Sequence, residues 1–411
     1  MSKSSKSSCD DDSDVNVNLD NCNYVDVLDK PIDEEEIRNG CKQLKSSKAT
    51  FDGWCPSMIT RCSNYFLPII LFIFNFILLN HNFPTSWILT LVKPIFKNKG
   101  SRSVAKYFRP VSLIKMLSKL LDFVLMNRFK EWFTPSDEQS AYQAGRSCGD
   151  NVFLLRCIIS LAKRSKQKLY LITVDFDGAF DRISRNKLFR KLILFGAGTT
   201  YVACLMAIYN RTECIIFGNK ENIVYGINSG IKQGSPMSPL LFLFYVDDLF
   251  EYFVSSFASF CIYEIIHVLM HADDLILIAS TRSLAISKVK HLIAYCRRNS
   301  IILEPTKSQF VVINGTDVDH TDIKIDDVLI SHCSYLSLLG SHLSESGCLK
   351  DDMSHHLTKR YQTCVKFYNF VRSNRVAPLQ VKLKVLKSCV LSNLLYNCET
   401  FGTDVPKQLD T

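Results

Sequence analysis

The sequence predicts an α+β protein. Three β-rich runs, at residues 169–174, 265–270 and 275–279, stand among longer segments in which apolar residues return every three or four positions. Residues 271–274 leave a gap between the last two runs that is short enough for a hairpin, so we expect antiparallel strands. With 411 residues, 47% of them hydrophobic, the chain can bury a sizeable core in two or three domains.

The N-terminal segment differs in composition from the rest of the chain. The first 36 residues hold eleven acids against three lysines, a net charge of −8, and few large apolar side chains. Such a composition does not offset the entropy of ordering, so we expect residues 1–35 to form a flexible acidic tail. The remainder carries +17. A positive balance of that size favours a polyanionic partner, because neutralising phosphates releases counterions.

The elements before the first β-rich run follow from local patterns. Acids at residues 33–36 mark a helix start, where the helix dipole favours negative charge. The apolar stretch 66–79 contains a proline and an asparagine and is shorter than the about 20 residues of a bilayer span, so we expect a buried helix and no membrane span. Between residues 87 and 114, short apolar runs alternate with basic and Gly/Pro positions, which indicates strands and basic loops. Helical periodicity is present at residues 117–133, 152–163, 185–195 and, in a basic segment, 353–402.

The sixteen cysteines are scattered along the chain. They form no CxxC pair and no Cys/His cluster at zinc-ligand spacing, so we expect neither a zinc module nor a disulfide scaffold. The N-terminus has Ser, Lys and Asp where a signal peptide would have an apolar stretch. We therefore expect an intracellular protein with reduced cysteines.

Three aspartates form the strongest candidate site. Asp175 directly follows one β-rich run, and Asp273 and Asp274 lie in the tip of the expected hairpin. Two divalent cations about 3.5–4 Å apart need carboxylates fixed on rigid neighbouring strands, and Mg²⁺ prefers such hard oxygen ligands. The alternative is that the Asp-Asp pair is ordinary turn chemistry and that Asp175 caps a helix. Taken singly, each acid fits the alternative better.

The motifs around these acids decide between the two interpretations. They read DFDGAFD at residues 175–181, GIKQGSPMSP at 230–239 and HADD at 271–274. In this order they resemble the palm motifs of reverse transcriptases carried by LINE-type (non-LTR) retrotransposons of the jockey-like kind. The ten-residue Gly/Pro-rich run is the most specific of the three. The resemblance implies that the three aspartates are catalytic and hold two Mg²⁺ ions.

The same resemblance implies roles for other residues of these motifs. Phe180 would pack under the sugar of the incoming nucleotide, and Gln233 and Gly234 would belong to a loop that faces the nucleotide and the template. His271, on the primer side, stands where the family usually has Tyr or Phe. A histidine there is still planar, but it can become charged and it packs less apolar area.

Flanking segments extend the resemblance. WILTLVKPIFKNKG at residues 87–100 and FRPVSL at 108–113 are similar to the fingers motifs of LINE-type enzymes, and QSAYQAGRS begins at residue 139. Arg109 and Lys93 would meet the triphosphate, since a guanidinium grips phosphate oxygens bidentately; the alternative is a solvated basic face. Downstream, Lys307 lies in a motif whose lysine can protonate the leaving pyrophosphate.

The resemblance implies a right-hand polymerase with fingers, palm and thumb, whose palm is an antiparallel sheet backed by helices. We expect an N-terminal extension and fingers within residues 36–147, a reverse transcriptase domain over 80–343 with its palm core at about 168–343, and a partial helical thumb over 344–411. Residues 335–340 resemble the primer-grip region. No endonuclease precedes this domain, so we expect a fragment or a decayed copy.

The implied function is RNA-directed DNA polymerisation during retrotransposition. Deoxynucleotides would be added to a primer 3′-hydroxyl on an RNA template, with a DNA primer or nicked target DNA as partner and the nucleus as location. One alternative is a catalytically inactive nucleic-acid-binding remnant. Another is an intron-encoded maturase, which would normally add an RNA-binding segment after the thumb.

Overall fold

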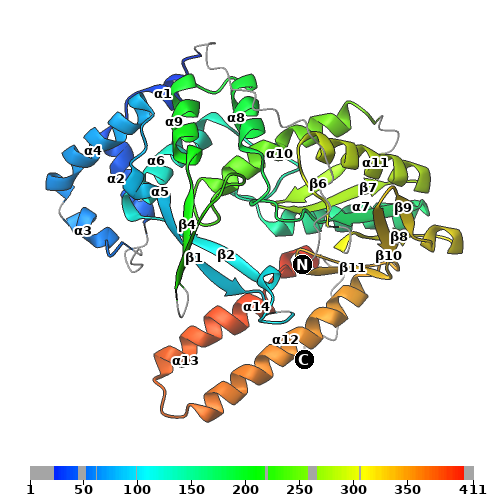
Figure 1. Ribbon diagram of the computed structural model, residues 1–411. Helices are drawn as coiled ribbons and strands as arrows, with labels where there is room; N and C mark the ends of the chain where they lie inside the picture. Colours follow the sequence, from blue (N-terminus) through cyan, green and yellow to red (C-terminus); the bar gives the residue numbers. More distant parts are fainter. Residues whose placement is uncertain are drawn as a thin grey trace. The chain divides into compact units, whose positions relative to one another are not determined.

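The computed structural model divides the chain into two compact units. One unit comprises residues 1–134 and 180–245, and the other comprises 135–179 and 246–411. The structure describes residues 23–44, 52–61, 63–98, 100–217, 221–257, 266–304 and 307–401. Helix α10 (Ser238–Val254) crosses from the first unit into the second (Figure 1). In the described parts of the chain, no helix is both long and apolar enough to cross a membrane.

The first unit contains a four-stranded sheet. Strand β1 (Leu89–Phe96) pairs antiparallel with β2 (Phe108–Leu113) and parallel with β4 (Glu213–Phe217), and β5 (Asn222–Gly226) closes the order β2-β1-β4-β5. The strands expected between residues 87 and 114 are therefore β1 and β2. The helices of this unit are α1 (Asp26–Asp29), α2 (Glu34–Gln43), α3 (Pro56–Arg61), α4 (Ser63–Asn80), α5 (Thr85–Ile88), η1 (Ala105–Tyr107), α6 (Met116–Trp132), α8 (Arg185–Leu194) and α9 (Thr199–Asn210).

The segment before α2 is anchored on α6 by one buried arginine. Arg128, 2% exposed, donates hydrogen bonds to the backbone oxygens of Leu28, Lys30 and Pro31 and to both carboxylate oxygens of Glu36. The predicted flexible tail was therefore wrong for residues 23–35, because buried backbone acceptors and apolar side chains order them. Residues 1–22 of that tail lie outside the described residues.

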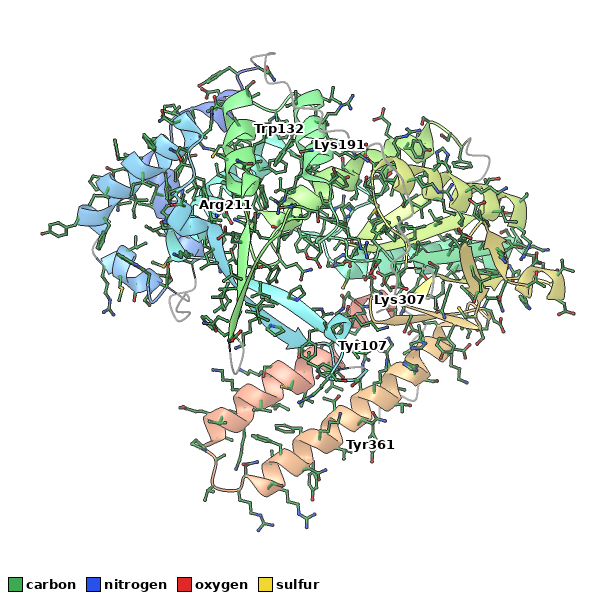
Figure 2. The ribbon with its side chains drawn as sticks, in the orientation of Figure 1. Tyr107, Trp132, Lys191, Arg211, Lys307 and Tyr361 are labelled. Carbon is green, nitrogen blue, oxygen red and sulfur yellow. The ribbon has the colours of Figure 1, made fainter. Side chains whose placement is uncertain are left out.

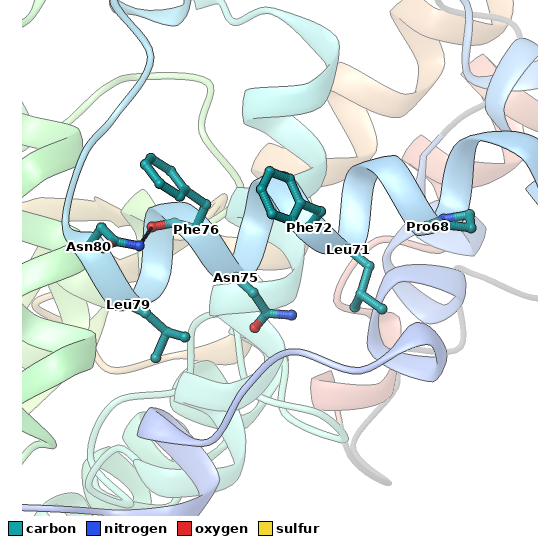
Figure 3. Close-up of a pocket in the computed structure, with 7 residues that line it drawn as sticks. All are labelled: Pro68, Leu71, Phe72, Asn75, Phe76, Leu79 and Asn80. Atoms are coloured by element: carbon teal, nitrogen blue, oxygen red, sulfur yellow. Dashed lines mark hydrogen bonds between the residues drawn. The ribbon is translucent and has the colours of Figure 1, made fainter.

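Helix α4 confirms the helix expected at residues 66–79, but it is not buried on all sides. Phe74 and Ile77 are buried, whereas Phe72 is 71% exposed and Phe76 and Leu79 are also exposed. These three exposed residues line an apolar groove along the helix (Figure 3). The other residues that line this groove are Pro68, Leu71, Asn75 and Asn80. The expectation of a buried helix was right for one side only, because the stretch carries apolar side chains on several sides while only one side packs on the protein.

A six-stranded sheet forms the centre of the second unit. Its order is β6-β7-β3-β8-β10-β9, and every neighbouring pair is antiparallel except β8 and β10. The strands are β3 (Leu169–Val174), β6 (Val268–His271), β7 (Asp274–Ala279), β8 (Gln309–Ile313), β9 (Ile323–Ile325) and β10 (Val328–His332). The strand expected at residues 169–174 and the expected hairpin are thus both present.

Helices and a small hairpin cover this sheet. Helix α7 (Cys148–Ser165) and the hairpin of β11 (Tyr335–Leu338) and β12 (Ser341–Ser344) share one apolar core with β3 and β8. Helix α11 (Arg282–Arg298) packs on β7 and β3. The remaining elements are η4 (Asp317–His320), α12 (Leu349–Ser373), α13 (Leu379–Val385), the π-helical turn η5 (Leu386–Leu391), α14 (Ser392–Leu394) and η6 (Cys398–Phe401). The α+β class is confirmed.

Candidate functional site

Strand pairing brings the three aspartates to one edge of the six-stranded sheet. Val174, the last residue of β3, pairs with Leu275 of β7, so Asp175 and Asp274 occupy neighbouring positions at the ends of adjacent strands. Asp274 also pairs with His271, which leaves Ala272 and Asp273 as the two-residue tip of the β6–β7 hairpin. Ala272 has a φ of 58°, the left-handed conformation that a turn this tight requires.

A buried amide braces this tip. The Gln139 side chain is 1% exposed, and its oxygen accepts a hydrogen bond from the Ala272 N–H at 2.9 Å. Asn151 of α7 donates to the backbone oxygen of Met270 in β6 at 2.9 Å. Sequence reasoning had not assigned a role to Gln139, although it begins the QSAYQAGRS run. Because both amides are buried, they hold the tip against rigid parts of the unit.

The site concentrates negative charge. Part of the Asp274 side chain is exposed, yet desolvation by the surrounding protein, followed by the charges of Asp273 and Asp175, raises the pKa of Asp274 to about 6. Lys307, labelled in Figure 2, is half-exposed, and its ammonium forms an ion pair with Asp175. The negative charges of Asp273 and Asp175 thus disfavour ionisation of Asp274, and the Lys307 ammonium partly compensates them.

His271 is held beside the aspartates as a neutral ring. Its Nδ1 lies 2.8 Å from the Ser140 hydroxyl oxygen. Burial lowers the pKa of His271, although the Asp273 charge opposes the shift. The imidazole is therefore uncharged near neutral pH, so it resembles the uncharged ring of the usual Tyr or Phe more closely than a charged histidine would.

The GIKQGSPMSP loop, in the first unit, is fastened by its own polar contacts. The Gln233 amide donates to both carboxylate oxygens of Asp181 at 3.1 and 3.0 Å, and its backbone oxygen accepts from the Ser112 N–H in β2 at 2.6 Å. Gly234 has a φ of 125°, and a β-carbon there would overlap the Ser112 carbonyl oxygen. Only glycine allows this close approach of the loop to β2.

A buried ionic cluster lies under the same loop. Asp122 of α6 is 6% exposed and accepts a hydrogen bond from the Ser235 hydroxyl at 2.6 Å. Burial raises the pKa of Asp122, while the nearby charge of Lys232 opposes the shift. Lys232 is itself buried and lies over the rings of Phe83 and Tyr209. Sequence reasoning missed this cluster, because nothing local in α6 marks Asp122 as a partner of the loop.

The first unit also contains three further residues that are expected to bind nucleotide, Phe180, Lys93 and Arg109, whereas Lys307 lies in the second. The Phe180 ring stacks on Phe242 with centroids 5.1 Å apart. Lys93 and Arg109 are exposed on paired strands, where Lys93 faces Val111 and Arg109 faces Ile95. Directly opposed residues share a sheet face, so both cations lie on the same face of the β1–β2 hairpin.

Comparison with known proteins identifies the family. The reverse transcriptase (RNA-dependent DNA polymerase) family matches residues 96–367, well over half of the chain. The chain belongs to this family. The match covers the strands and loops that carry the three aspartates, the GIKQGSPMSP loop and Lys307. It therefore confirms the family expected from the motifs, and with it the α+β polymerase fold.

Curated relatives of this reverse transcriptase come from non-LTR retrotransposons. It is 23% identical over 390 residues to the probable RNA-directed DNA polymerase from transposon BS of Drosophila melanogaster, covering 91% of this chain and 42% of that protein. It is 26% identical over 388 residues to a Pol polyprotein from the type-1 retrotransposable element R2 of Popillia japonica, covering 90% and 52%. The chain thus spans about half the length of these relatives.

A solved structure with a similar chain is the telomerase from Candida albicans in complex with a TWJ fragment of telomeric RNA. The TM-score is 0.43 at 14% identity, with 76% of this chain and 57% of that chain covered.

The predicted site residues of this reverse transcriptase are divided between its two units. One unit contains Asp175, Asp273, Asp274, His271 and Lys307, and the other contains Phe180, Gln233, Gly234, Lys93 and Arg109.

Proposed function

We propose that this reverse transcriptase adds deoxynucleotides to a primer 3′-hydroxyl on an RNA template, as part of retrotransposition. The observation that carries the proposal is the position of Asp175 and Asp274 at the ends of paired strands, with Asp273 in the adjoining turn. Rigid neighbouring strands are what a metal-dependent phosphoryl transfer needs, because such chemistry depends on positioning and charge stabilisation.

The donor set at these aspartates fits Mg²⁺. All three side chains offer carboxylate oxygens. Desolvation, followed by the charges of Asp273 and Asp175, raises the pKa of Asp274, and the Lys307 ammonium lies beside Asp175 where a cation could bind. Asp175, Asp273 and Asp274 would hold two such ions. When bound, the ions would activate the primer hydroxyl and neutralise charge on the triphosphate.

The remaining residues have roles in binding and proton transfer. Lys307, 52% exposed, can reach solvent and protonate the leaving pyrophosphate. Gln233 and Gly234 would face the nucleotide, Phe180 would support its sugar, and Arg109 with Lys93 would bind triphosphate oxygens. His271, neutral and half-buried, would pack on the primer side.

The domain scheme and the partners belong to the same proposal. We assign residues 80–343 to the reverse transcriptase domain, with the palm core at about 168–343, fingers within 36–147 and a partial thumb over 344–411. On α12 and the turn after it, exposed Lys359, Lys366, Arg372 and Arg375 supply positive charge for an RNA–DNA duplex. Because the partner would be a DNA primer or nicked target DNA, we place the protein in the nucleus.

Primer extension tests the proposal. The purified chain is given an RNA template with an annealed DNA primer, deoxynucleotides and Mg²⁺. We expect extended product from the unchanged chain and a loss of about a thousandfold or more in Asp273→Asn, because one carboxylate ligand is removed. Asp327→Asn, in an exposed turn of the same unit, is the matched control and should extend normally.

The alternative function has a distinct signature in the same experiment. A chain that binds the primed template in a salt-dependent manner but yields no product would be an inactive nucleic-acid-binding remnant. Equal extension by Asp273→Asn and the unchanged chain would contradict the proposed role of the aspartates.

A further inference from the structure

A second cluster of ligand side chains lies in the unit of the six-stranded sheet, and it shares no residue with the aspartate site. Of the described residues, only His320, His332 and Glu345 bring three ligand atoms within 4.8 Å of one another. His320 is the last residue of η4, His332 is the last residue of β10, and Glu345 directly follows β12. Three separate elements, all within residues 317–345, therefore supply one ligand each.

His332 is held in place from two sides. Its ring contacts the buried Phe310 ring edge-on, with centroids 5.4 Å apart. Its backbone N–H donates to the Asp322 carboxylate at 2.8 Å. The backbone N–H of Glu345 donates to the Ser334 oxygen at 2.9 Å, which fixes the start of the loop after β12. Ligands positioned by packing and hydrogen bonds are the condition for a preorganised metal site.

His320 is the last residue of η4, and the hydrogen bonds that cap this turn hold it in place. The Asp319 carboxylate accepts from the Thr316 N–H at 2.8 Å, and it also binds Lys168 and the Tyr170 hydroxyl of β3. This anchoring sets the His320 ring parallel to the His332 ring, with centroids 4.6 Å apart.

The Nε2 nitrogen of His332 is placed to bind a cation. Its Nε2 is buried and has no hydrogen-bond partner among the described residues, and it lies 3.7 Å from a Glu345 carboxylate oxygen. A buried imidazole nitrogen without a partner is costly, and a bound metal ion removes that cost.

We propose that His320, His332 and Glu345 bind a Zn²⁺ ion. Two imidazole nitrogens and one carboxylate oxygen are a known zinc donor set that leaves the fourth tetrahedral position to water. Ligand atoms about 2.0–2.2 Å from a tetrahedral ion lie about 3.3–3.6 Å apart. The His332 and Glu345 ligand atoms are 3.7 Å apart and all three ligand atoms lie within 4.8 Å of one another, so the side chains must move inward to reach that spacing. The absence of CxxC pairs does not bear on this site, because it uses no cysteine.

The bound ion would fasten the β11–β12 hairpin to the sheet. The hairpin supplies Glu345, whereas His332 ends a sheet strand and His320 lies on the turn that β3 anchors. The ion would therefore act as a cross-link among three segments and would stabilise the run at residues 335–340. Its role is structural, and it is independent of nucleotide addition by the aspartates.

Metal titration of the full chain without an affinity tag tests this assignment. Co²⁺ serves as the spectroscopic probe and Zn²⁺ as its competitor, in a chain carrying Asp175→Asn, Asp273→Asn and Asp274→Asn so that the aspartate site does not contribute. We expect one equivalent of Co²⁺ with ligand-field bands that Zn²⁺ abolishes. Loss of a supporting contact at metal sites weakens binding about 10–100-fold, so removing a ligand should weaken it by about 100-fold or more.

Three further variants make the test specific. His332→Ala removes a ligand, and Glu345→Gln removes the charge while keeping the side-chain shape; each should weaken Co²⁺ binding and reduce the rise in Tm that Zn²⁺ produces. His81→Asn is the matched control, because His81 is exposed and its φ of 54° suits asparagine. Absence of stoichiometric binding, or equal affinity in Glu345→Gln and the His81→Asn control, would overturn the proposal.

Discussion

Replacing Gly234 by alanine tests the close approach of the GIKQGSPMSP loop to strand β2. An alanine in a left-handed conformation costs about 1–2 kcal/mol, and Gly234 has a φ of 125°. Its β-carbon would overlap the Ser112 carbonyl oxygen and lie 3.3 Å from the Ser112 carbonyl carbon. Ordinary contact needs about 3.5 Å, and backbone atoms yield less easily than a side chain, so overpacking adds about 1–3 kcal/mol. We expect a total loss of about 2–5 kcal/mol in the free energy of unfolding.

The same overlap should impair nucleotide addition. The loop must move by roughly 1 Å to relieve it, and a displacement of that size at a positioning residue costs about a hundredfold in rate. Urea unfolding measures the stability, and single-turnover primer extension measures the rate.

The matched control for this substitution is Gly53→Ala. Gly53 has a φ of 79°, but no atom lies within 4 Å of a β-carbon built there, so this variant isolates the cost of the backbone conformation. We expect it to lose about 1 kcal/mol and to extend primers normally. The reasoning fails if Gly234→Ala loses no more stability than Gly53→Ala and extends primers at the unchanged rate.

Three further substitutions have defined outcomes. Arg128→Met should lower the free energy of unfolding in urea by about 3–5 kcal/mol, because buried carbonyls and a carboxylate lose their donor; a loss below about 1 kcal/mol would contradict this. Burial raises the pKa of Asp319, but hydrogen bonds from Lys168 and Tyr170 outweigh it and lower the pKa. The Asp319 carboxylate therefore stabilises the fold above the pKa that it has in the unfolded chain, about 4, and this stabilisation is lost as the pH falls below that value. In urea unfolding, Asp319→Asn should have a lower free energy of unfolding than the unchanged chain at pH 7, and the difference should shrink below about pH 4. His271→Tyr should raise the single-turnover rate of nucleotide addition by rebuilding the apolar contact on the primer side; unchanged rates from about pH 6 to 8 would refute that.

Elements with a strong local pattern were predicted well. Strand β3 has the predicted bounds, and α6 and α7 differ from the predicted helices by a few residues at their ends. The hairpin strands extend to His271 and Asp274 because these two residues pair across the turn. Periodicity and β-propensity are properties of adjacent residues, so a single segment carries the whole signal.

The errors arose where burial depends on distant partners. Helix α4 was expected to be buried because its sequence is apolar, but nothing in that sequence shows which side packs on the protein. The segment before α2 was expected to be flexible because its composition is polar, yet Arg128 holds it from about 100 residues away.

The sequence by itself determined strands β1, β2, β3, β6 and β7, the helices with a clear apolar periodicity and the motifs that identify a reverse transcriptase, including the order of Asp175, Asp273 and Asp274. Only the tertiary structure decided that Gln139 braces the hairpin tip, that Asp122 lies under the GIKQGSPMSP loop, and that two histidines and a glutamate gather around one point. These contacts join residues separated by up to more than a hundred positions. Their partners are chosen by packing of whole elements, which leaves no periodic or spacing signal in either segment alone.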